Sequence, residues 1–388
     1  MRIAIIGAGI TGLALAAALD RAGISCTVFE RANELGEVGA GIQLAPNAVR
    51  LLHRLGLEKD LEAVGVPSAG IELRHWEHGG RIGHIPLGLE CEHRFGAPYY
   101  LVSRPDLHAA LLRRVPLDAV RLSMSCSGFE SSSDGVRLFF SDGTVESADL
   151  VVGADGIAST IRSNLAQDEP RFSGQTVYRG LAEVRHTPHL GVEPRSWIWA
   201  GPGRHFVCYP VAAGRLINFV ATIPTERWDA ESWSEPGSLE DVLGAFNGWD
   251  STVHRVIEAA GAVTRWALHV RDADFTWSRE RVTLAGDAAH PMLPFLAQGA
   301  TQGIEDAFAL AACLKQSTKD TIPAALERYE AARRPRAALV QRRSGELTRV
   351  LHDADAASTI AQPPGSAQAD PLSAVAWLFD YDAEQVPM

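Results

Sequence analysis

The sequence predicts an α/β protein in which a Rossmann-like parallel sheet carries an inserted, β-sheet-rich region and is followed by a long C-terminal helix. Three observations predict this class. A strand, a helix and a second strand succeed one another at the N-terminus. Short alternating strands fill the stretch from about 170 to 280, and a strand–turn–helix pattern returns near 281. A β-α-β succession implies parallel strands, whereas runs of short strands indicate a separate sheet.

The N-terminal unit is recognised by its apolar runs and by the glycines that end them. Residues 2–6, RIAII, form a short apolar run that Gly7 ends, which is typical of a buried strand. Residues 11–22 are rich in Ala and Leu and stop at Gly23, a common residue after a helix. Residues 25–31 predict the second strand. A crossover of this length joins parallel strands.

The C-terminal part is predicted as one long helix and a tail. The arginines at 333, 334, 336, 342 and 343 alternate with glutamates, so we interpret their helix as a solvated face. The tail from about 353 is rich in Ala, Pro, Ser and Asp and is expected to be loosely ordered. The other expected elements are helices at 46–57, 105–115, 238–247 and 322–350, a hairpin around Asp142-Gly143 and a strand at 149–153.

Composition excludes several classes of function. The net charge of −11 argues against a nucleic-acid partner. No apolar run reaches the roughly 18 residues of a membrane span, and the N-terminus reads as a strand rather than a signal peptide. The five cysteines are scattered without a CxxC pair, so we expect no metal site and a reducing, cytoplasmic location. We expect a monomer or homodimer that acts on a small molecule.

The first glycine cluster predicts a dinucleotide site. Gly7, Gly9 and Gly12 form GxGxxG, with Thr11 inside it, between a strand and a helix. These glycines allow a tight turn, a close approach of backbone to pyrophosphate and close helix packing, and the helix N-terminus offers N–H groups to phosphate. Glu30 ends the next strand, where a carboxylate can accept from a ribose and would repel a 2′-phosphate. The cluster leaves NAD and FAD open.

The second cluster distinguishes these two cofactors. Asp287 follows a buried strand and can accept hydrogen bonds from a sugar-like chain. Gly299 and Ala300 then lead into a helix whose N-terminus favours negative charge. Glu305 and Asp306 suit the first turns of this helix, which is a sufficient structural reason for them. NAD would need nothing so far along the chain, whereas FAD is long enough to reach both clusters.

Three motifs together resemble a known family. GAGITG…E, GADGIASTIR and AGDAAHPMLPFLAQGATQGIEDA look like those of the class A flavoprotein monooxygenases, the aromatic hydroxylases of the p-hydroxybenzoate hydroxylase fold. The resemblance covers essentially residues 1–350. The stretches GEVGAGIQLAPNAVRLLHRLGL and YYLVSRPDLHAALL bring the chain closer to the salicylate, 3-hydroxybenzoate 6- and 6-hydroxynicotinate 3-hydroxylases.

This resemblance implies the domain organisation and the cofactor-binding residues. Glu30 and Arg31 would flank the adenosine, and Arg104 would reach the pyrophosphate of FAD. In the turn that follows the strand at 149–153, Asp155 and Gly156 would help to bind the flavin phosphates and the reduced nicotinamide. The further residues assigned to the cofactor are Gln43, Cys126, Asp287 at the ribityl chain, and Pro291, Pro294, Gly299 and Ala300 near the flavin ring. The domains implied are an FAD-binding domain in three parts (1–72, 101–168 and 279–352, the last with the C-terminal helix), a substrate domain (73–100 and 169–278) and a tail (353–388).

The resemblance also implies the reaction. FAD would be held tightly without a covalent bond, and NADH or NADPH would bind transiently and reduce it. Dioxygen would then form a flavin C4a-hydroperoxide that hydroxylates a small phenolic or hydroxylated N-heteroaromatic ring, expected to bear a carboxylate. Such a site needs a hydrogen-bond acceptor for the ring hydroxyl and shielding from water.

Two residues are predicted to be catalytic. His205 and Tyr209 lie four apart on an expected strand and therefore share a face. The resembling 3-hydroxybenzoate 6-hydroxylases carry a His and a Tyr in this arrangement; a buried Tyr and a core His are the structural alternative. Tyr178 and Arg179, expected at the start of another strand, are candidates for substrate binding. The 6-hydroxynicotinate hydroxylases place histidines where this chain has Gln43 and Phe295, which suggests a bulkier or less charged substrate.

Three other functions are compatible with parts of the same sequence. A flavin-dependent halogenase would show WxWxIP and a catalytic lysine, but this chain has WIWAGP at 197–202 and no lysine between Lys59 and Lys315. An NAD-dependent dehydrogenase leaves the stretch around Asp287 unexplained. A flavin-binding regulator would hold a yellow cofactor without oxidising NAD(P)H.

Overall fold

The Rossmann-like sheet expected from the sequence is present as five parallel strands. The structure is a computed structural model that describes residues 1–36, 41–166, 168–187, 190, 193–228, 234–273, 275–353 and 370–385. The order of the strands in this sheet is β19 (Val282–Leu284), β12 (Leu150–Gly153), β1 (Ile3–Ile6), β2 (Cys26–Phe29) and β8 (Val120–Arg121). The core around the sheet is built largely from Ala, Leu, Ile and Val of its strands and of the helices packed on it.

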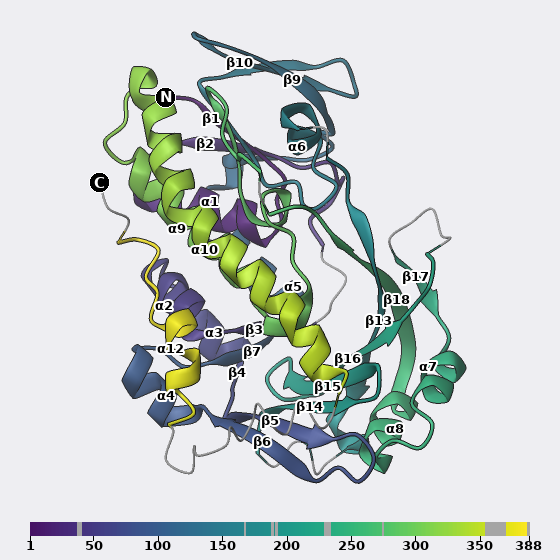
Figure 1. Cartoon of the computed structure of the whole chain (residues 1–388). Helices are drawn as coiled ribbons and strands as arrows, with labels where there is room; N and C mark the ends of the chain where they lie inside the picture. The colour runs from purple at the N-terminus through teal and green to yellow at the C-terminus, as the bar shows by residue number, and fades with distance from the viewer. Residues whose placement is uncertain are drawn as a thin grey trace.

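Three helices pack around the two glycine-rich turns of this sheet. They are α1 (Ile10–Arg21), α5 (Arg104–Leu112) and α9 (Gly299–Leu314). Helix α1 contacts both α9 and α5, although α9 lies almost three hundred residues further along the chain. The two glycine clusters are therefore neighbours in space (Figure 1).

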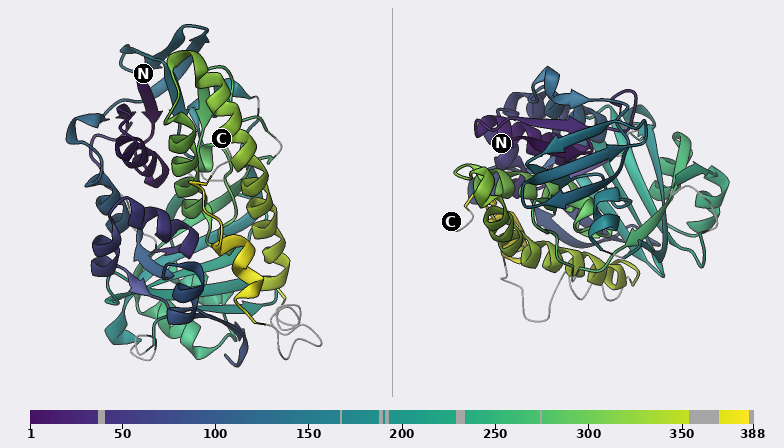
Figure 2. Two further views of the ribbon diagram at one scale, coloured as in Figure 1. Left: turned by 90° about the vertical axis from the view of Figure 1, so that its left-hand side faces the viewer. Right: turned by 90° about the horizontal axis from the view of Figure 1, so that it is seen from above.

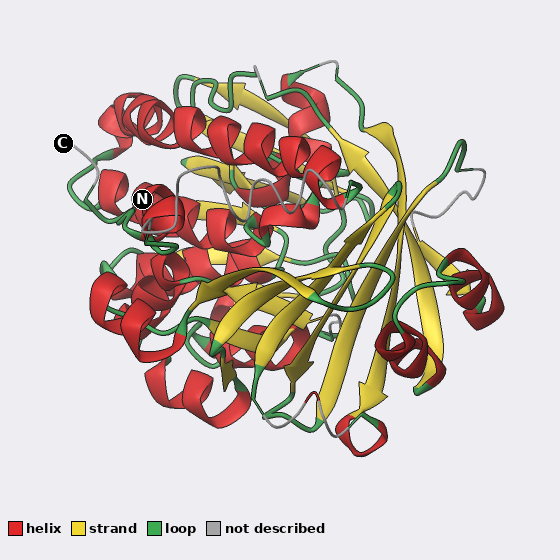
Figure 3. Cartoon of the chain, turned by 60° about the horizontal axis from the view of Figure 1, so that its bottom comes forward, coloured by secondary structure: helices red, strands yellow, loops and turns green. Residues whose placement is uncertain are grey.

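The second large unit is an eight-stranded sheet. Figure 3 shows its long strands fanning out beside the helix-rich part of the molecule. Helices α7 (Leu239–Ala245) and α8 (Ser251–Glu258) pack their apolar side chains on one face. The order of its strands is β17 (Ser234–Gly237), β18 (Ala260–Val270), β13 (Arg171–Glu183), β16 (Leu216–Pro224), β15 (Arg204–Val211), β14 (Arg195–Gly201), β5 (Gly70–His75) and β6 (Arg81–Pro86).

The strands expected between 170 and 280 are confirmed, with one correction. Tyr178 and Arg179 lie in the middle of β13 and not at its start, because this strand runs for 13 residues. The domain boundaries given above stay a prediction.

Two small sheets complete the β structure. One contains β11 (Val145–Ala148), β10 (Gly135–Phe140) and β9 (Cys126–Ser132), which includes the expected hairpin. The other contains β3 (Gly41–Leu44), β7 (Tyr100–Ser103) and β4 (Val66–Pro67). The remaining helices of the N-terminal half are α2 (Pro46–Arg54), α3 (Glu58–Val64), α4 (Gly88–Phe95) and α6 (Thr160–Leu165).

A single long helix connects the two large sheets. Helix α10 (Ile322–Leu351) has 30 residues and runs along most of the molecule (Figures 1 and 2). The expectation of a solvated face is wrong in part, because Arg333 on this helix is completely buried. Beyond residue 353 the structure describes the tail at 370–385, where α12 (Ser373–Phe379) is a helix and Phe379 packs against Phe95 and Tyr99. The prediction that much of the tail is loosely ordered otherwise lies outside the described residues. In the part of the chain that the structure describes, the helices lack the continuous apolar length that a membrane span requires.

Candidate active site

The first glycine turn has the geometry of a phosphate cradle. A Cβ atom on Gly12 would overlap the carbonyl oxygen of Gly7, so the packing of α1 on this turn requires glycine. A Cβ atom on Gly9 would instead meet open space. No side chain caps the N-terminus of α1, which leaves its first N–H groups available to an anionic ligand.

Glu30 links this turn to the strand that follows α1. Its carboxylate accepts from the backbone N–H of Ala8 at 2.8 Å and from that of Ala32 at 2.9 Å. The carboxylate therefore holds the glycine turn in shape, in addition to facing the space beside it.

A cavity of about 360 Å³ brings the two glycine clusters together. Gly12, Gln43, Pro291 and Pro294 lie outside its lining. Met124 and Ser125, which line it just before Cys126, were not predicted from the sequence. No side chain caps the N-terminus of α9 either. The residues predicted to bind the cofactor that line the cavity are Gly7, Gly9, Thr11, Glu30, Arg31, Arg104, Cys126, Asp155, Gly156, Asp287, Gly299 and Ala300.

Five charged residues line the cavity: Glu30, Arg31, Arg104, Asp155 and Asp287. Burial raises the pKa of Asp155, against the hydrogen bonds that its carboxylate accepts from Ser159 Oγ at 2.5 Å and from the N–H of Thr160 at 2.8 Å. The surrounding protein also raises the pKa of Asp287, while the charges of His290 and Arg104 lower it. Asp287 is exposed to the cavity, so its carboxylate can still accept from a ligand hydroxyl.

Thr11 ties the two ends of the cavity together. Gly286, with a φ of +62°, forms the turn after β19, and Gly303 lies in α9. A Cβ atom at either glycine would overlap Oγ1 of Thr11. The threonine of the first motif therefore packs directly against the second motif.

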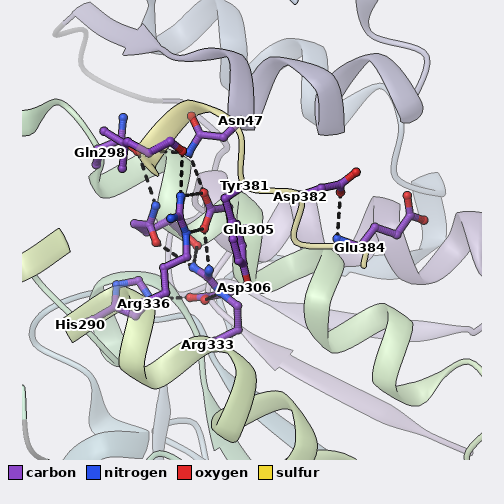
Figure 4. Close-up of polar contacts among 12 residues, drawn as sticks. Asn47, His290, Gln298, Glu305, Asp306, Arg333, Arg336, Tyr381, Asp382 and Glu384 are labelled. Carbon is purple, nitrogen blue, oxygen red and sulfur yellow. Dashed lines mark hydrogen bonds and ion pairs between the residues drawn. The ribbon is translucent and has the colours of Figure 1, made fainter. Parts of the chain in front are cut away.

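A buried ionic cluster holds the second motif from behind. In Figure 4, Arg333 and Arg336 of α10 point toward Glu305 and Asp306 of α9. Arg333 donates to Glu305 at 2.5 Å and to Asp306 at 2.8 Å, and Arg336 donates to Glu305 at 2.7 and 2.9 Å. Asp306 also accepts from the N–H of Gly286 at 2.8 Å. These contacts correct the view that Glu305 and Asp306 only suit the start of a helix.

The charges of this cluster are mutually stabilising. Burial alone would raise the pKa of Asp306, but His290 and Arg333 lower it below its ordinary value. Burial acts in the same way on Glu305, where Arg333 and Arg336 lower the pKa. Both carboxylates are therefore ionised inside the protein, and the position of the turn at Gly286 depends on them.

One face of the eight-stranded sheet carries the predicted catalytic residues. In the β15–β16 pair, His205 lies opposite Thr222, and Tyr209 lies opposite Asn218. Side chains two apart on a strand share a face, so these four point to the same side. Arg179 lies opposite Val220, between Asn218 and Thr222, and therefore points to this side too.

The opposite face explains the place of Tyr178. It packs with Phe206 and Phe219 in the core under α7 and α8, away from Arg179. The structure does not bring Tyr178 together with the other candidate substrate residues. The sequence alone does not show which face of β13 is covered by α7 and α8, so it could not show which of Tyr178 and Arg179 lies in that core.

The face of the sheet that carries His205 and Tyr209 is covered from two directions. The N–H of Gly41, in β3, donates to Oδ1 of Asn218 at 2.8 Å, beside the ring of Tyr209. Oε1 of Gln43 accepts from Tyr99 at 3.0 Å and from Ser196 at 2.9 Å, so this side chain is anchored to protein groups.

The second cover is the turn at Pro294–Leu296. Within it, the ring of Phe295 meets the ring of His205 edge-on at 4.9 Å. The structure thus brings His205, Tyr209, Arg179, Gln43 and Phe295 around one side of the sheet.

Comparison with known proteins identifies the family. Residues 1–344 match the FAD binding domain family. The chain is 47% identical to 3-amino-4-hydroxybenzoate 2-monooxygenase PtnB3 of Streptomyces platensis over 385 residues, covering 99% of this chain and 97% of that protein. It is 36% identical to 6-hydroxynicotinate 3-monooxygenase of Bordetella bronchiseptica, covering 100% and 97%. The structure of Klebsiella pneumoniae HpxO complexed with FAD and uric acid matches with a TM-score of 0.83 and 29% identity, covering 93% of this chain and 92% of that one.

The chain therefore belongs to the FAD binding domain family, and the resemblance to the aromatic hydroxylases is confirmed. It is an FAD-dependent aromatic-ring monooxygenase that takes its electrons from NAD(P)H. The dehydrogenase, halogenase and regulator readings are set aside. The roles of the individual site residues stay predictions.

The two glycines of the first turn predict separable effects. We expect Gly12→Ala to lower the stability of the apoprotein by about 1–3 kcal/mol, because the added methyl group overlaps the backbone of Gly7. Gly9→Ala should leave the apoprotein stable but weaken FAD binding, because its methyl group enters the cavity. Thermal unfolding without FAD and fluorescence titration with FAD measure the two effects. Equal destabilisation by both substitutions would contradict this assignment.

The buried cluster predicts a large loss of stability when one cation is removed. Arg333→Leu should cost about 3–5 kcal/mol, because it leaves Glu305 and Asp306 buried with too little positive charge. Arg342→Leu, on the exposed side of the same helix, is the matched control and should change stability by less than about 0.5 kcal/mol. Urea unfolding of both variants measures the difference, and similar midpoints would contradict the predicted role of Arg333.

Proposed function

We propose that this monooxygenase hydroxylates an aminohydroxybenzoate, with 3-amino-4-hydroxybenzoate as the preferred substrate and C2 as the carbon attacked. The observation that carries this proposal is the 47% identity to a 3-amino-4-hydroxybenzoate 2-monooxygenase over nearly the whole length of both chains. The presence of Gln43 and Phe295 in place of the histidines of the hydroxynicotinate pattern supports it, because two titratable groups are missing from the side of the sheet that carries His205 and Tyr209.

Two buried donors on the sheet face support a carboxylate substrate. Among the described residues, Nε of Arg179 and Nδ2 of Asn218 have no hydrogen-bond partner. Oδ1 of Asn218 accepts from Gly41, so the amide nitrogen is the atom left without a partner. Buried donors without partners are costly, and an anionic ligand would satisfy both.

The electrostatics of Arg179 agree with this role. Burial lowers the pKa of its guanidinium, Tyr209 acts against that shift, and Arg104 adds to it. Arg104 also lines the cofactor cavity. The negative charge of a carboxylate bound at Arg179 would offset both the burial of its guanidinium and the repulsion from Arg104.

The residues of the cavity fit FAD. The uncapped N-termini of α1 and α9, Arg104 and the open space at Gly9 would receive its phosphates and the oxygen side of its ring, and Glu30 and Asp287 its hydroxyl groups. When bound, FAD passes the electrons of NAD(P)H to dioxygen and so supplies the reactive oxygen.

The protein's own part is to orient the ring and to withdraw a proton. C2 of 3-amino-4-hydroxybenzoate is adjacent to the carbon that bears the amino group, so the nitrogen lone pair makes C2 electron-rich. A hydrogen-bond acceptor near the ring substituents strengthens this donation. His205 has this capacity, and Tyr209 can orient the ring. Phe295 and the apolar side chains around it exclude water.

Finer properties of the protein are also proposed. We expect a monomer or homodimer in the cytoplasm that binds no nucleic acid and no membrane. The net charge of −11 and the scattered cysteines support this expectation.

Turnover of a substrate panel tests the proposed function. The purified protein, loaded with FAD, is incubated with NADH or NADPH and with 3-amino-4-hydroxybenzoate, 3-hydroxybenzoate or 6-hydroxynicotinate. We expect 3-amino-4-hydroxybenzoate to give the highest kcat/KM and a product with one added oxygen at C2, identified by mass spectrometry and NMR. NAD(P)H oxidation without any hydroxylated product would overturn the proposal.

Arg179 predicts a specific loss of substrate affinity. We expect Arg179→Met to raise KM for 3-amino-4-hydroxybenzoate about 10- to 100-fold, since a hydrogen bond to a charged group contributes about 1.5–3 kcal/mol. FAD binding should be unchanged. 2-Aminophenol, which lacks the carboxylate, should be little affected by the substitution. Arg171→Met, at the exposed start of the same strand, is the control. An equal change in KM for both compounds would rule out a carboxylate contact.

A further inference from the structure

We propose that His352, at the C-terminal end of α10, forms a proton relay with His205 and carries the substrate's proton away from the ring. This inference rests on the proposed function, because it requires a ring substituent that loses a proton beside His205. It adds a residue from outside the three cofactor motifs, which the sequence reasoning did not single out.

The contacts of His205 define the relay. Its side chain is almost completely buried, and both ring nitrogens have partners. Nε2 lies 3.2 Å from Oγ1 of Thr222, and Nδ1 lies 3.1 Å from Nε2 of His352. The ring of Phe295 packs against His205 at 4.9 Å and against His352 at 6.4 Å between centroids. The two imidazoles are therefore hydrogen-bonded to each other beside the apolar ring of Phe295.

The position of His352 is fixed by the backbone at both of its ends. Its N–H donates to the carbonyl of Thr348 at 3.0 Å, and its carbonyl accepts from the N–H of Gly203 at 2.9 Å. Gly203 lies in the turn between β14 and β15, two residues before His205. The end of α10 is thus joined to the hairpin that carries His205, and the half-buried ring of His352 lies between that histidine and the surface.

The proton balance of the relay is simple. Once oxygen has bonded to C2, the amino nitrogen carries positive charge, and Nε2 of His205 accepts one of its protons in place of the contact with Thr222. Nδ1 of His205 passes its own proton to Nε2 of His352, and Nδ1 of His352 releases its proton to water. The substrate loses one proton, water gains one, and each histidine ends as the other neutral tautomer. The starting tautomers return when each imidazole ring turns over, or when one proton travels the path in the opposite direction, from water to the bound product; no electrons move.

The charges around the pair keep it neutral at rest. Burial lowers the pKa of His205 well below its usual value, and His352 adds to this shift. Burial followed by the positive charge of Arg204 lowers the pKa of His352 to about 4. Among the described residues, Thr222 and Phe295 face the pair from β16 and from the 294–296 turn and do not titrate, and Asp353 follows His352 in the chain.

Two substitutions of His352 separate a relay from a structural prop. His352→Gln keeps a side chain that can hydrogen-bond His205 but does not exchange protons, and His352→Leu removes the hydrogen bond as well. We expect both variants to lower kcat by about 100-fold with KM changed less than threefold, at the lower end of general acid–base effects. In the Gln variant the acid limb of the kcat profile should move to higher pH, because His352 no longer opposes protonation of His205. Full activity of His352→Gln with an inactive His352→Leu would reduce His352 to a positioning residue and overturn the relay.

Controls keep this test separate from folding and from the proposed function. FAD absorbance and the melting temperature confirm that each variant folds, and His93→Gln, exposed on α4, should behave as wild type. If the wild-type protein hydroxylates none of the benzoates, the proposed function fails. The pair is then judged by ¹⁵N–¹H spectra of the imidazoles: the hydrogen-bonded proton between His205 and His352 should be present in wild type and absent in His352→Leu. Its absence from the wild-type spectrum would refute the pair.

Discussion

The buried ionic contact between α9 and α10 is the constraint on which the rest of the site depends. Glu305 and Asp306 cannot remain charged in the interior without Arg333 and Arg336, because an unpaired buried carboxylate is far more costly than a buried pair. The pair need not stabilise the fold relative to an apolar core. What it provides is a defined geometry, because Asp306 also binds the N–H of Gly286 and fixes the turn after β19.

From that turn, the constraint reaches the other end of the cavity. Thr11 in α1 packs on Gly286 and on Gly303, where any larger residue would collide with it. The first glycine turn and the turn at Gly286 are therefore positioned by a single packed unit, although they are separated by most of the chain. Because the cavity is already rigid, binding a long cofactor costs the conformational freedom of the cofactor but little of the protein's, and this favours tight non-covalent binding.

The sequence predicted the parts of this site that depend on local chemistry. GxGxxG with Glu30, the turn at Asp155 and the helix after Gly299 each follow from short-range backbone rules, and all lie at the cavity. The unpredicted parts depend on pairing across the chain. The face on which Arg179 lies is set by the register of β13 against β16, and the burial of Arg333 is set by which side of α10 meets α9. Neither property can be predicted from the residues that neighbour Arg179 or Arg333 in the sequence.

Helix α10 contacts both the second motif and the eight-stranded sheet. Arg333 and Arg336, in its first half, hold the cofactor turn, and its end joins the hairpin of β14 and β15 through His352 and Gly203. Between them, Ser344 donates to the carbonyl of Leu293 at 2.5 Å. One continuous helix therefore contacts the cofactor motif at α9, the apolar turn at Phe295 and the sheet that carries His205. The ring carbon must be positioned relative to the reactive oxygen with a precision of a fraction of an ångström, and water must be excluded. A helix that holds the two sheets in a fixed relation is therefore the structural feature that this chemistry needs most.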